Sequence, residues 1–298
     1  MSYPGYLANA RFGQAPAGPL VCDNSRIPAL VTKIPFTLNR VFGTCQKRGV
    51  FGEKDPGSVI RAAVERALEM LDKTIGDLVA ARTRVCSGES PATAVNAIML
   101  DWLKNRLSVC ADDIRVWTAG TFVNRSVAEV IRRLTRVRNL IASNVILYVC
   151  NGPQCDPDEW AYVLVDPTCQ RTEPTIVRLC SNFWVRAPTV SETDHKEFQA
   201  QTIIHEASHL YHCTADAPGR TVGVAECLRQ FVAVTNGSPL DPDFATRCPP
   251  TTVCASVPVA GVSGYSDLGF AAPVPLRKLS TVFRSQNAVR VSAPSVRR

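Results

Sequence analysis

The amino-acid sequence predicts an α+β protein that is mainly helical and contains a small sheet. Three observations lead to this class: long stretches of helical apolar periodicity, a middle region of short runs rich in Val, Ile and Tyr, and a later periodic stretch that carries three of the four histidines. The 298 residues are 46% hydrophobic and 20% charged, which suits a globular protein with a buried core. No stretch approaches the roughly 18 apolar residues of a membrane-spanning helix, so we expect no membrane span.

The first helix is expected to follow an irregular N-terminal segment. Residues 1–55 are rich in Pro and Gly and show little periodicity, although a short strand is expected near 29–36. Residues 56–84 are predicted to be helical because apolar side chains recur there at four-residue steps. These side chains belong to Val59, Ala63, Ala67, Leu71 and Ile75.

Two more helices and a small sheet are expected next. A helix is predicted over 92–107, after Pro91, and another over 126–143, where apolar residues share one face and arginines another. Three short runs rich in β-branched residues then follow, separated by Asn, Gly, Pro and Asp, and they are predicted to be strands. These runs are 145–150, 160–166 and 175–180.

The last helices and the tail complete the predicted order. The periodic stretch 198–212 is expected to be helical, and so is 221–235, which stops at Asn236 and Gly237. We expect three segments: the irregular 1–55, a folded domain over 56–255, and a basic, Pro- and Ser-rich tail over 256–298. The tail contributes much of the net charge of +7, but only one aromatic residue, Phe283, lies among its arginines, so no nucleic-acid partner is expected.

The most informative motif lies in the stretch 198–212. His205, Glu206 and His209 form the pattern HExxH. On a helix, residues four apart lie on one face, so both imidazoles can bind one Zn²⁺ ion. Glu206 is then predicted to be the general base toward a water activated by the metal. The pattern is typical of a zinc-dependent hydrolase.

A catalytic zinc site needs a third protein ligand. His212 shares the helix face, but seven residues separate it from His205, which is roughly 10 Å along the axis and too far for one ion. Glu226 is the predicted third ligand, because it lies on the next helix among apolar neighbours, where a carboxylate needs a partner. Asp216 is the reserve ligand. His195 is expected to be a surface histidine.

Three segments resemble one family of peptidases. They are Ile176–Trp184 (IVRLCSNFW), Gln201–His209 (QTIIHEASH), and Ala225-Glu226 with Phe231. These segments are similar to the aspzincin metallopeptidases, the group of deuterolysin and the peptidyl-Lys metalloendopeptidases. The resemblance covers roughly residues 160–235.

The resemblance implies a zincin-like fold, a zinc cofactor and a protein or peptide substrate. Glu226 stands where the family has an aspartate ligand. Thr214-Ala215-Asp216 matches part of the loop that follows the family's HExxH helix, which would make Asp216 a residue that orients a ligand.

The twelve cysteines indicate an oxidising compartment. Their number is even and no CxxC pair occurs, so up to six disulfides are expected in place of a zinc ribbon. A bridge between Cys213 and Cys227, or from each to other loops, is expected beside the metal site. No signal peptide is visible in the first twenty residues. Because of the cysteines we still expect the protein to be secreted or otherwise extracytoplasmic. We also expect it to be a monomer.

The sequence thus predicts a zincin-like zinc endopeptidase, and two alternatives remain. One is a thermolysin-like gluzincin, which also uses a downstream glutamate. The other is a secreted, disulfide-stabilised interaction protein with an inactive zinc site. The sequence does not rank Tyr211, Arg220 and Tyr265 as donors to the oxyanion of the transition state.

Overall fold

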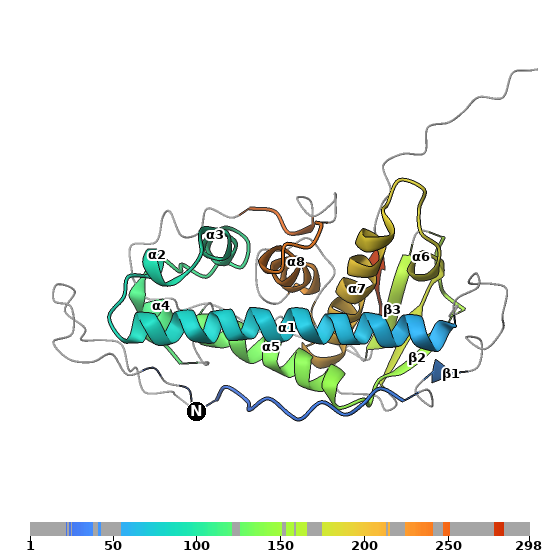
Figure 1. Ribbon diagram of the computed structural model, residues 1–298, viewed down its shortest axis with the longest axis horizontal. Helices are drawn as coiled ribbons and strands as arrows, with labels where there is room; N and C mark the ends of the chain where they lie inside the picture. The colour runs from blue at the N-terminus through green and yellow to red at the C-terminus, as the bar shows by residue number, and fades with distance from the viewer. Residues whose placement is uncertain are drawn as a thin grey trace, which may run out of the picture.

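A computed structural model gives the arrangement of the chain. The structure describes residues 22, 24, 26–37, 41–42, 55–120, 126–150, 153–157, 159–165, 175–212, 214, 224–240, 247–250 and 277–282. Its elements, in chain order, are β1 (Val41–Phe42), α1 (Pro56–Cys86), α2 (Pro91–Ala94), α3 (Ala97–Asn105), α4 (Ile114–Thr118), α5 (Val127–Ala142), β2 (Leu147–Cys150), β3 (Glu159–Val165), β4 (Ile176–Leu179), α6 (Ser181–Trp184), α7 (Glu192–His212), α8 (Ala225–Thr235) and β5 (Arg277–Val282). The predicted α+β class is confirmed, and the small sheet lies at one end of the molecule (Figure 1).

The long helix α1 organises the helical part of the fold. Asp55 caps its start by accepting a hydrogen bond from the backbone N–H of Ser58 at 2.9 Å, and Pro56 occupies the first helical position. The helix packs against α5, α7 and α8, with α5 along one side and α8 on the other (Figure 1). Ile60, Leu71 and Leu78 are fully buried there. The helix predicted over 56–84 is therefore confirmed.

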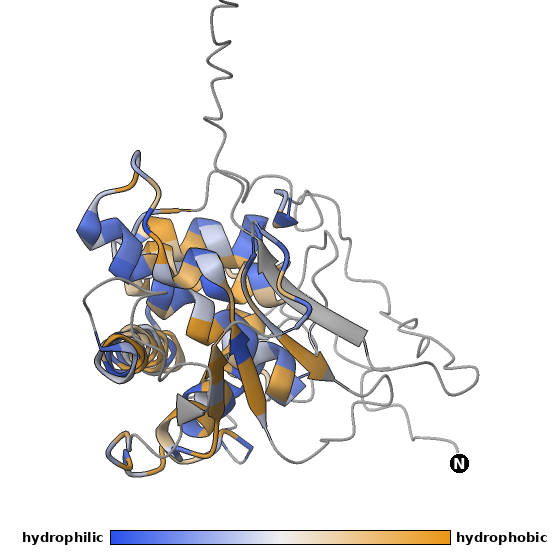
Figure 2. Ribbon diagram, turned by 90° about the vertical axis from the view of Figure 1, so that its right-hand side faces the viewer, coloured by the Kyte–Doolittle hydropathy of each residue, from blue (hydrophilic) through white to orange (hydrophobic). Residues whose placement is uncertain are grey.

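The sheet has the strand order β1-β2-β4-β3-β5 within the described part of the chain. β2 runs parallel to β1 and β4, and β3 runs antiparallel to β4 and β5. Hydrophobic residues predominate along its central strands (Figure 2). The three predicted strands are confirmed as β2, β3 and β4. The structure adds β1 and also β5, which lies within 256–298, where the sequence predicts no strand.

The strand predicted near 29–36 is wrong. Residues 28–37 form no regular element and instead run along α5. The backbone N–H of Ile34 donates to the carbonyl of Ala142 at 2.9 Å, and the Asn139 side chain bonds Ala29 and Val31. Pro28 and Pro35 lack the N–H donors that a paired strand needs.

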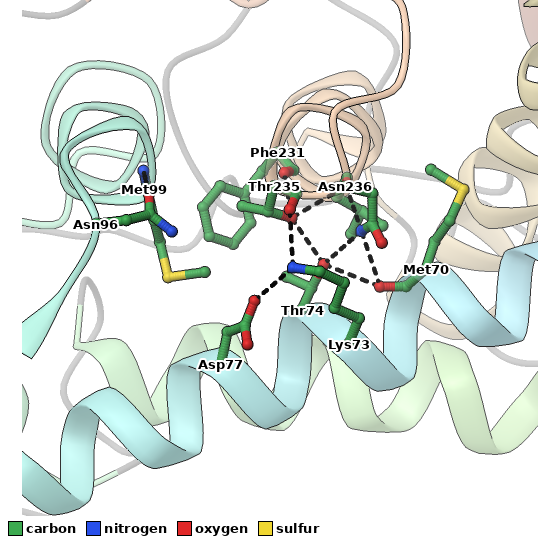
Figure 3. Close-up of polar contacts among 10 residues, drawn as sticks. Met70, Lys73, Thr74, Asp77, Asn96, Met99, Phe231, Thr235 and Asn236 are labelled. Atoms are coloured by element: carbon green, nitrogen blue, oxygen red, sulfur yellow. Dashed lines mark hydrogen bonds and ion pairs between the residues drawn. The ribbon is translucent and has the colours of Figure 1, made fainter.

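The helices α7 and α8 carry the predicted site, and both are firmly held. α7 begins six residues before the predicted start at 198 and contacts α1, α5, β3 and β5. The end of α8 is tied to α1, as Figure 3 shows: Lys73 donates to the carbonyl of Thr235 at 3.1 Å, and Asn236 donates to the carbonyl of Met70 at 3.1 Å and to Thr74 at 3.0 Å. None of the described helices is long and apolar enough to cross a membrane.

All cysteines within the described residues are disulfide-bonded. Three complete bridges lie there: Cys22–Cys86, Cys155–Cys180 and Cys227–Cys248. The predicted oxidised state is thus confirmed for these cysteines. Of the two expected arrangements, a bridge between Cys213 and Cys227 is wrong, whereas a bridge from Cys227 to another loop is confirmed, because Cys227 bonds Cys248. Cys213 itself lies outside the described residues.

Candidate metal centre

The HExxH motif lies in the last part of α7 and is buried. His205 is 1% exposed, and Glu206 and His209 are fully buried. One helical turn separates the two histidines, and their Nε2 atoms face each other at 2.9 Å. The rings are nearly perpendicular, with an interplanar angle of 83°. The structure therefore brings both predicted histidine ligands together at their Nε2 atoms.

This pair fits a metal ion. Two Zn–N bonds of about 2.0–2.1 Å at a tetrahedral angle place the nitrogens roughly 3.3 Å apart. The observed distance of 2.9 Å between the two Nε2 atoms would have to increase by only a few tenths of an ångström. Elsewhere in the described chain Cys155, Glu159 and Cys180 also cluster. However, both of those cysteines are bonded to each other and offer no thiolate.

The imidazole of His209 is oriented by Thr214. Its Nδ1 lies 2.7 Å from the carbonyl oxygen of Thr214 and 3.0 Å from the hydroxyl of the same residue. Since a carbonyl only accepts, Nδ1 carries the proton and Nε2 keeps its lone pair. The sequence does not indicate this role for Thr214, because the bond runs to the backbone.

Glu226, at the start of α8, contacts His205. One carboxylate oxygen of Glu226, Oε2, lies 3.5 Å from Nδ1 of His205. The other, Oε1, accepts hydrogen bonds from Arg229 and from Gln230, the latter at 2.8 Å. The carboxylate of the predicted third ligand therefore lies at the Nδ1 side of His205, whereas Nε2 faces His209.

The surroundings of Glu226 keep it ionised. Burial by itself raises the pKa of this carboxyl group, but the positive charge of Arg229 and the contact with His205 outweigh burial, so the net shift of the pKa is downward. Arg229 is fully buried as well. Arg229 and Gln230 are not among the predicted site residues, although their spacing of three and four residues from Glu226 on one helix is a usable signal.

Two other residues considered in the sequence, His212 and Tyr211, contact α5 and not the pair of His205 and His209. His212 donates from Nε2 to the carbonyl of Arg133 on α5 at 3.1 Å. Burial, together with the positive charges of the arginines on α5, lowers the pKa of His212 to about 3. Tyr211 has the guanidinium of Arg136 over its ring at 5.6 Å. Its side chain thus contacts α5.

His195 differs from its prediction as a surface residue. It is 7% exposed, and its ring centroid lies 5.1 Å from that of Trp160 in β3. This contact joins the first half of α7 to the sheet. Asp216, Arg220 and Tyr265 lie outside the described residues.

One protein family matches this part of the chain. Residues 115–230 match the family model of the aspzincins, which is described as lysine-specific metallo-endopeptidase. The matched range contains α5, the strands β2, β3 and β4, all of α7 and the start of α8. α1, β1 and β5 lie outside it. No curated protein matches the chain.

Proposed function

Because residues 115–230 match the aspzincin metallo-endopeptidases, we propose that the protein is a zinc-dependent endopeptidase with a zincin-like catalytic domain. The observation that carries this proposal is the buried HExxH pair, with Nε2 of His205 and Nε2 of His209 only 2.9 Å apart. The disulfides support a protein that works in an oxidising compartment, secreted or otherwise extracytoplasmic.

Each residue of the motif has a separate task in this proposal. His205 and His209 hold zinc through Nε2, and the bond from His209 to Thr214 keeps that ring in the required tautomer. Zinc, when bound, supplies Lewis-acid chemistry: it makes water more acidic and polarises a peptide carbonyl. Glu206 accepts a proton from the attacking water and then delivers it to the leaving amine. Its complete burial keeps that proton from bulk solvent.

Two residues are candidates for the third protein ligand of the zinc ion. Glu226 is the residue predicted from the sequence, and Asp216 is the reserve. Zinc content of purified Glu226→Ala and Asp216→Ala separates them, because loss of a direct ligand lowers affinity more than loss of a residue that contacts a ligand.

The substrate is proposed to be a protein or peptide. The matched family is described as lysine-specific, so cleavage should be followed on casein and on matched peptides with and without lysine. Zinc analysis of the oxidised protein, and digestion with and without a chelator, test the enzyme as a whole. A stoichiometric metal that is needed for cleavage supports the proposal, and cleavage unaffected by complete metal removal contradicts it.

The role of Glu206 has its own test. Glu206→Gln keeps the shape of the side chain and both histidines but removes the proton acceptor. We expect zinc to stay bound and turnover to fall by about 10²–10⁴. Glu192→Gln, the same change at an exposed position of α7, is the matched control and should leave turnover unchanged. Near-normal turnover of a zinc-loaded Glu206→Gln protein contradicts the role as base.

A further inference from the structure

The contacts of Glu226 suggest a task different from metal binding. We propose that Glu226 is a positioning residue that holds the ring of His205 from its Nδ1 side, and that Arg229 and Gln230 hold Glu226 in place for this task. This inference rests on the proposed function, because it takes Nε2 of His205 as the atom that binds zinc.

The distance to His205 distinguishes the two roles. A carboxylate bound to the same zinc as Nε2, with bonds of about 2.0–2.1 Å and tetrahedral angles, lies roughly 5 Å from Nδ1 of that histidine. The observed distance from Oε2 of Glu226 to Nδ1 is 3.5 Å. The carboxylate therefore stands where it attracts the Nδ1–H group, on the side of the ring that faces away from the metal.

Each of the two ring nitrogens that face away from the metal has an acceptor oxygen near it. Nδ1 of His209 faces the carbonyl of Thr214 at 2.7 Å, and Nδ1 of His205 faces the carboxylate of Glu226. A carbonyl and a carboxylate are both acceptor groups, so each favours the tautomer that carries the proton on Nδ1 and the lone pair on Nε2. The partner of His205 is an anion, whereas the partner of His209 is a neutral carbonyl.

Glu226 is held by neighbours on its own helix. Arg229 and Gln230 lie three and four residues further along α8, and both donate to Oε1. With Oε1 engaged by two donors, Oε2 is directed toward His205. Both Glu226 and Arg229 are buried, and a buried pair of this kind fixes geometry more than it adds stability.

The helix that carries Glu226 is fixed at both ends. The disulfide Cys227–Cys248 lies next to Glu226, and the contacts of Thr235 and Asn236 with α1 hold the other end (Figure 3). The position of His205 is thereby coupled to α1, outside the range that matches the peptidase family.

Metal affinity and cobalt spectroscopy test this role together. Glu226→Gln is measured alongside the double variant Glu226→Gln/Arg229→Met, which removes both buried charges and so avoids an unpaired arginine. We expect the zinc Kd of the variants to rise by about 10- to 100-fold, the range typical for loss of a residue that supports a ligand. The visible spectrum of the Co²⁺-loaded protein should keep its wild-type band positions, because the ligand set is unchanged.

Proton NMR of the Co²⁺-loaded protein adds a residue-specific readout. The wild type should show two strongly shifted, exchangeable Nδ1–H signals, one from each histidine. In the variants the His205 signal should shift or broaden through faster exchange with water, while the His209 signal stays. Glu197→Gln is the control, because it breaks an ion pair between α7 and Arg66 on α1 without touching the histidines; it should leave Kd and both signals unchanged.

Several results overturn the inference. A Co²⁺ spectrum of the variants that changes to that of a site with one ligand fewer makes Glu226 a direct ligand. An unchanged Kd and unchanged Nδ1–H signals in the folded double variant show that Glu226 does not support His205. Failure of the wild type to bind zinc or Co²⁺ overturns the proposed function itself, and the role of Glu226 with it.

Discussion

His212 shows how strongly position decides the behaviour of a histidine. It is three residues from His209, yet its Nε2 bonds a backbone carbonyl of α5 and its pKa is lowered to about 3, from an ordinary value of 6.5. Burial and nearby positive charges favour the neutral ring. This histidine is therefore a packing and hydrogen-bonding residue of the α5–α7 contact.

The titration of His212 predicts an acid sensitivity of folding. Between pH 6.5 and about 3 the unfolded chain binds a proton at this residue and the folded chain does not, so the free energy of unfolding falls as the pH is lowered through that window. The slope is at most about 1.4 kcal/mol per pH unit. Urea unfolding of the wild type and of His212→Asn at a series of pH values measures it. The variant should have the flatter profile and the same zinc content.

A profile of the variant as steep as that of the wild type would assign the acid sensitivity to other groups. Loss of zinc from His212→Asn would show that this residue contributes to the metal site. Above pH 6.5 the two proteins should have parallel profiles, because His212 is neutral in both states there.

At the scale of elements, α8 connects the disulfide framework to the metal site. Cys227–Cys248 closes a sequence separation of 21 residues beside Glu226, and Cys155–Cys180 closes 25 residues with neither cysteine on α7 or α8. In the chain-entropy picture, bridges over loops of this size stabilise the fold by similar amounts, roughly 3 kcal/mol each. Only the first of them should affect metal binding.

Removing each bridge tests this difference. Cys227→Ser/Cys248→Ser and Cys155→Ser/Cys180→Ser should both lower the free energy of unfolding by roughly 3 kcal/mol. The first variant alone should raise the zinc Kd, by about tenfold, because α8 then holds Glu226 less firmly. Chemical unfolding and competition with a chromophoric chelator give the two quantities. Equal zinc affinities of the two variants would contradict a link between this bridge and the metal site.

The sequence predicts those elements whose signals are local. The apolar positions of 56–84 and the β-branched runs at 145–150, 160–166 and 175–180 are such signals, and the corresponding elements are present. β1 has only two residues and β5 pairs with a strand more than a hundred positions earlier, so neither has a local pattern. The exposed Leu30, Val31 and Ile34 resemble a strand locally, but α5 supplies the hydrogen-bond partners of Val31 and Ile34.

The same limit applies to the candidate site. The four-residue spacing of His205 and His209 is sufficient to predict that their rings meet. The contact from Glu226 to His205 depends on how α8 packs on α7, and the contact from Thr214 to His209 uses a backbone carbonyl. Side-chain identities alone reveal neither of them. The sequence therefore predicts that the Nε2 atoms of the two histidines face the metal, but it does not predict which groups contact their Nδ1 atoms.

For the whole molecule, the late position of β5 in the sequence affects how the sheet forms during synthesis of the chain. The ribosome releases β3 roughly a hundred residues before the strand that completes the sheet beside it. During that interval the histidines of α7 have already been made, while one edge of β3 is open to any extended chain nearby. A polypeptide that ends before Arg277 should keep the edge of β3 unpaired and should therefore self-associate. Light scattering of the truncated and full-length chains would show this self-association. A truncated chain that stays a monodisperse monomer would mean that another segment covers the free edge of β3.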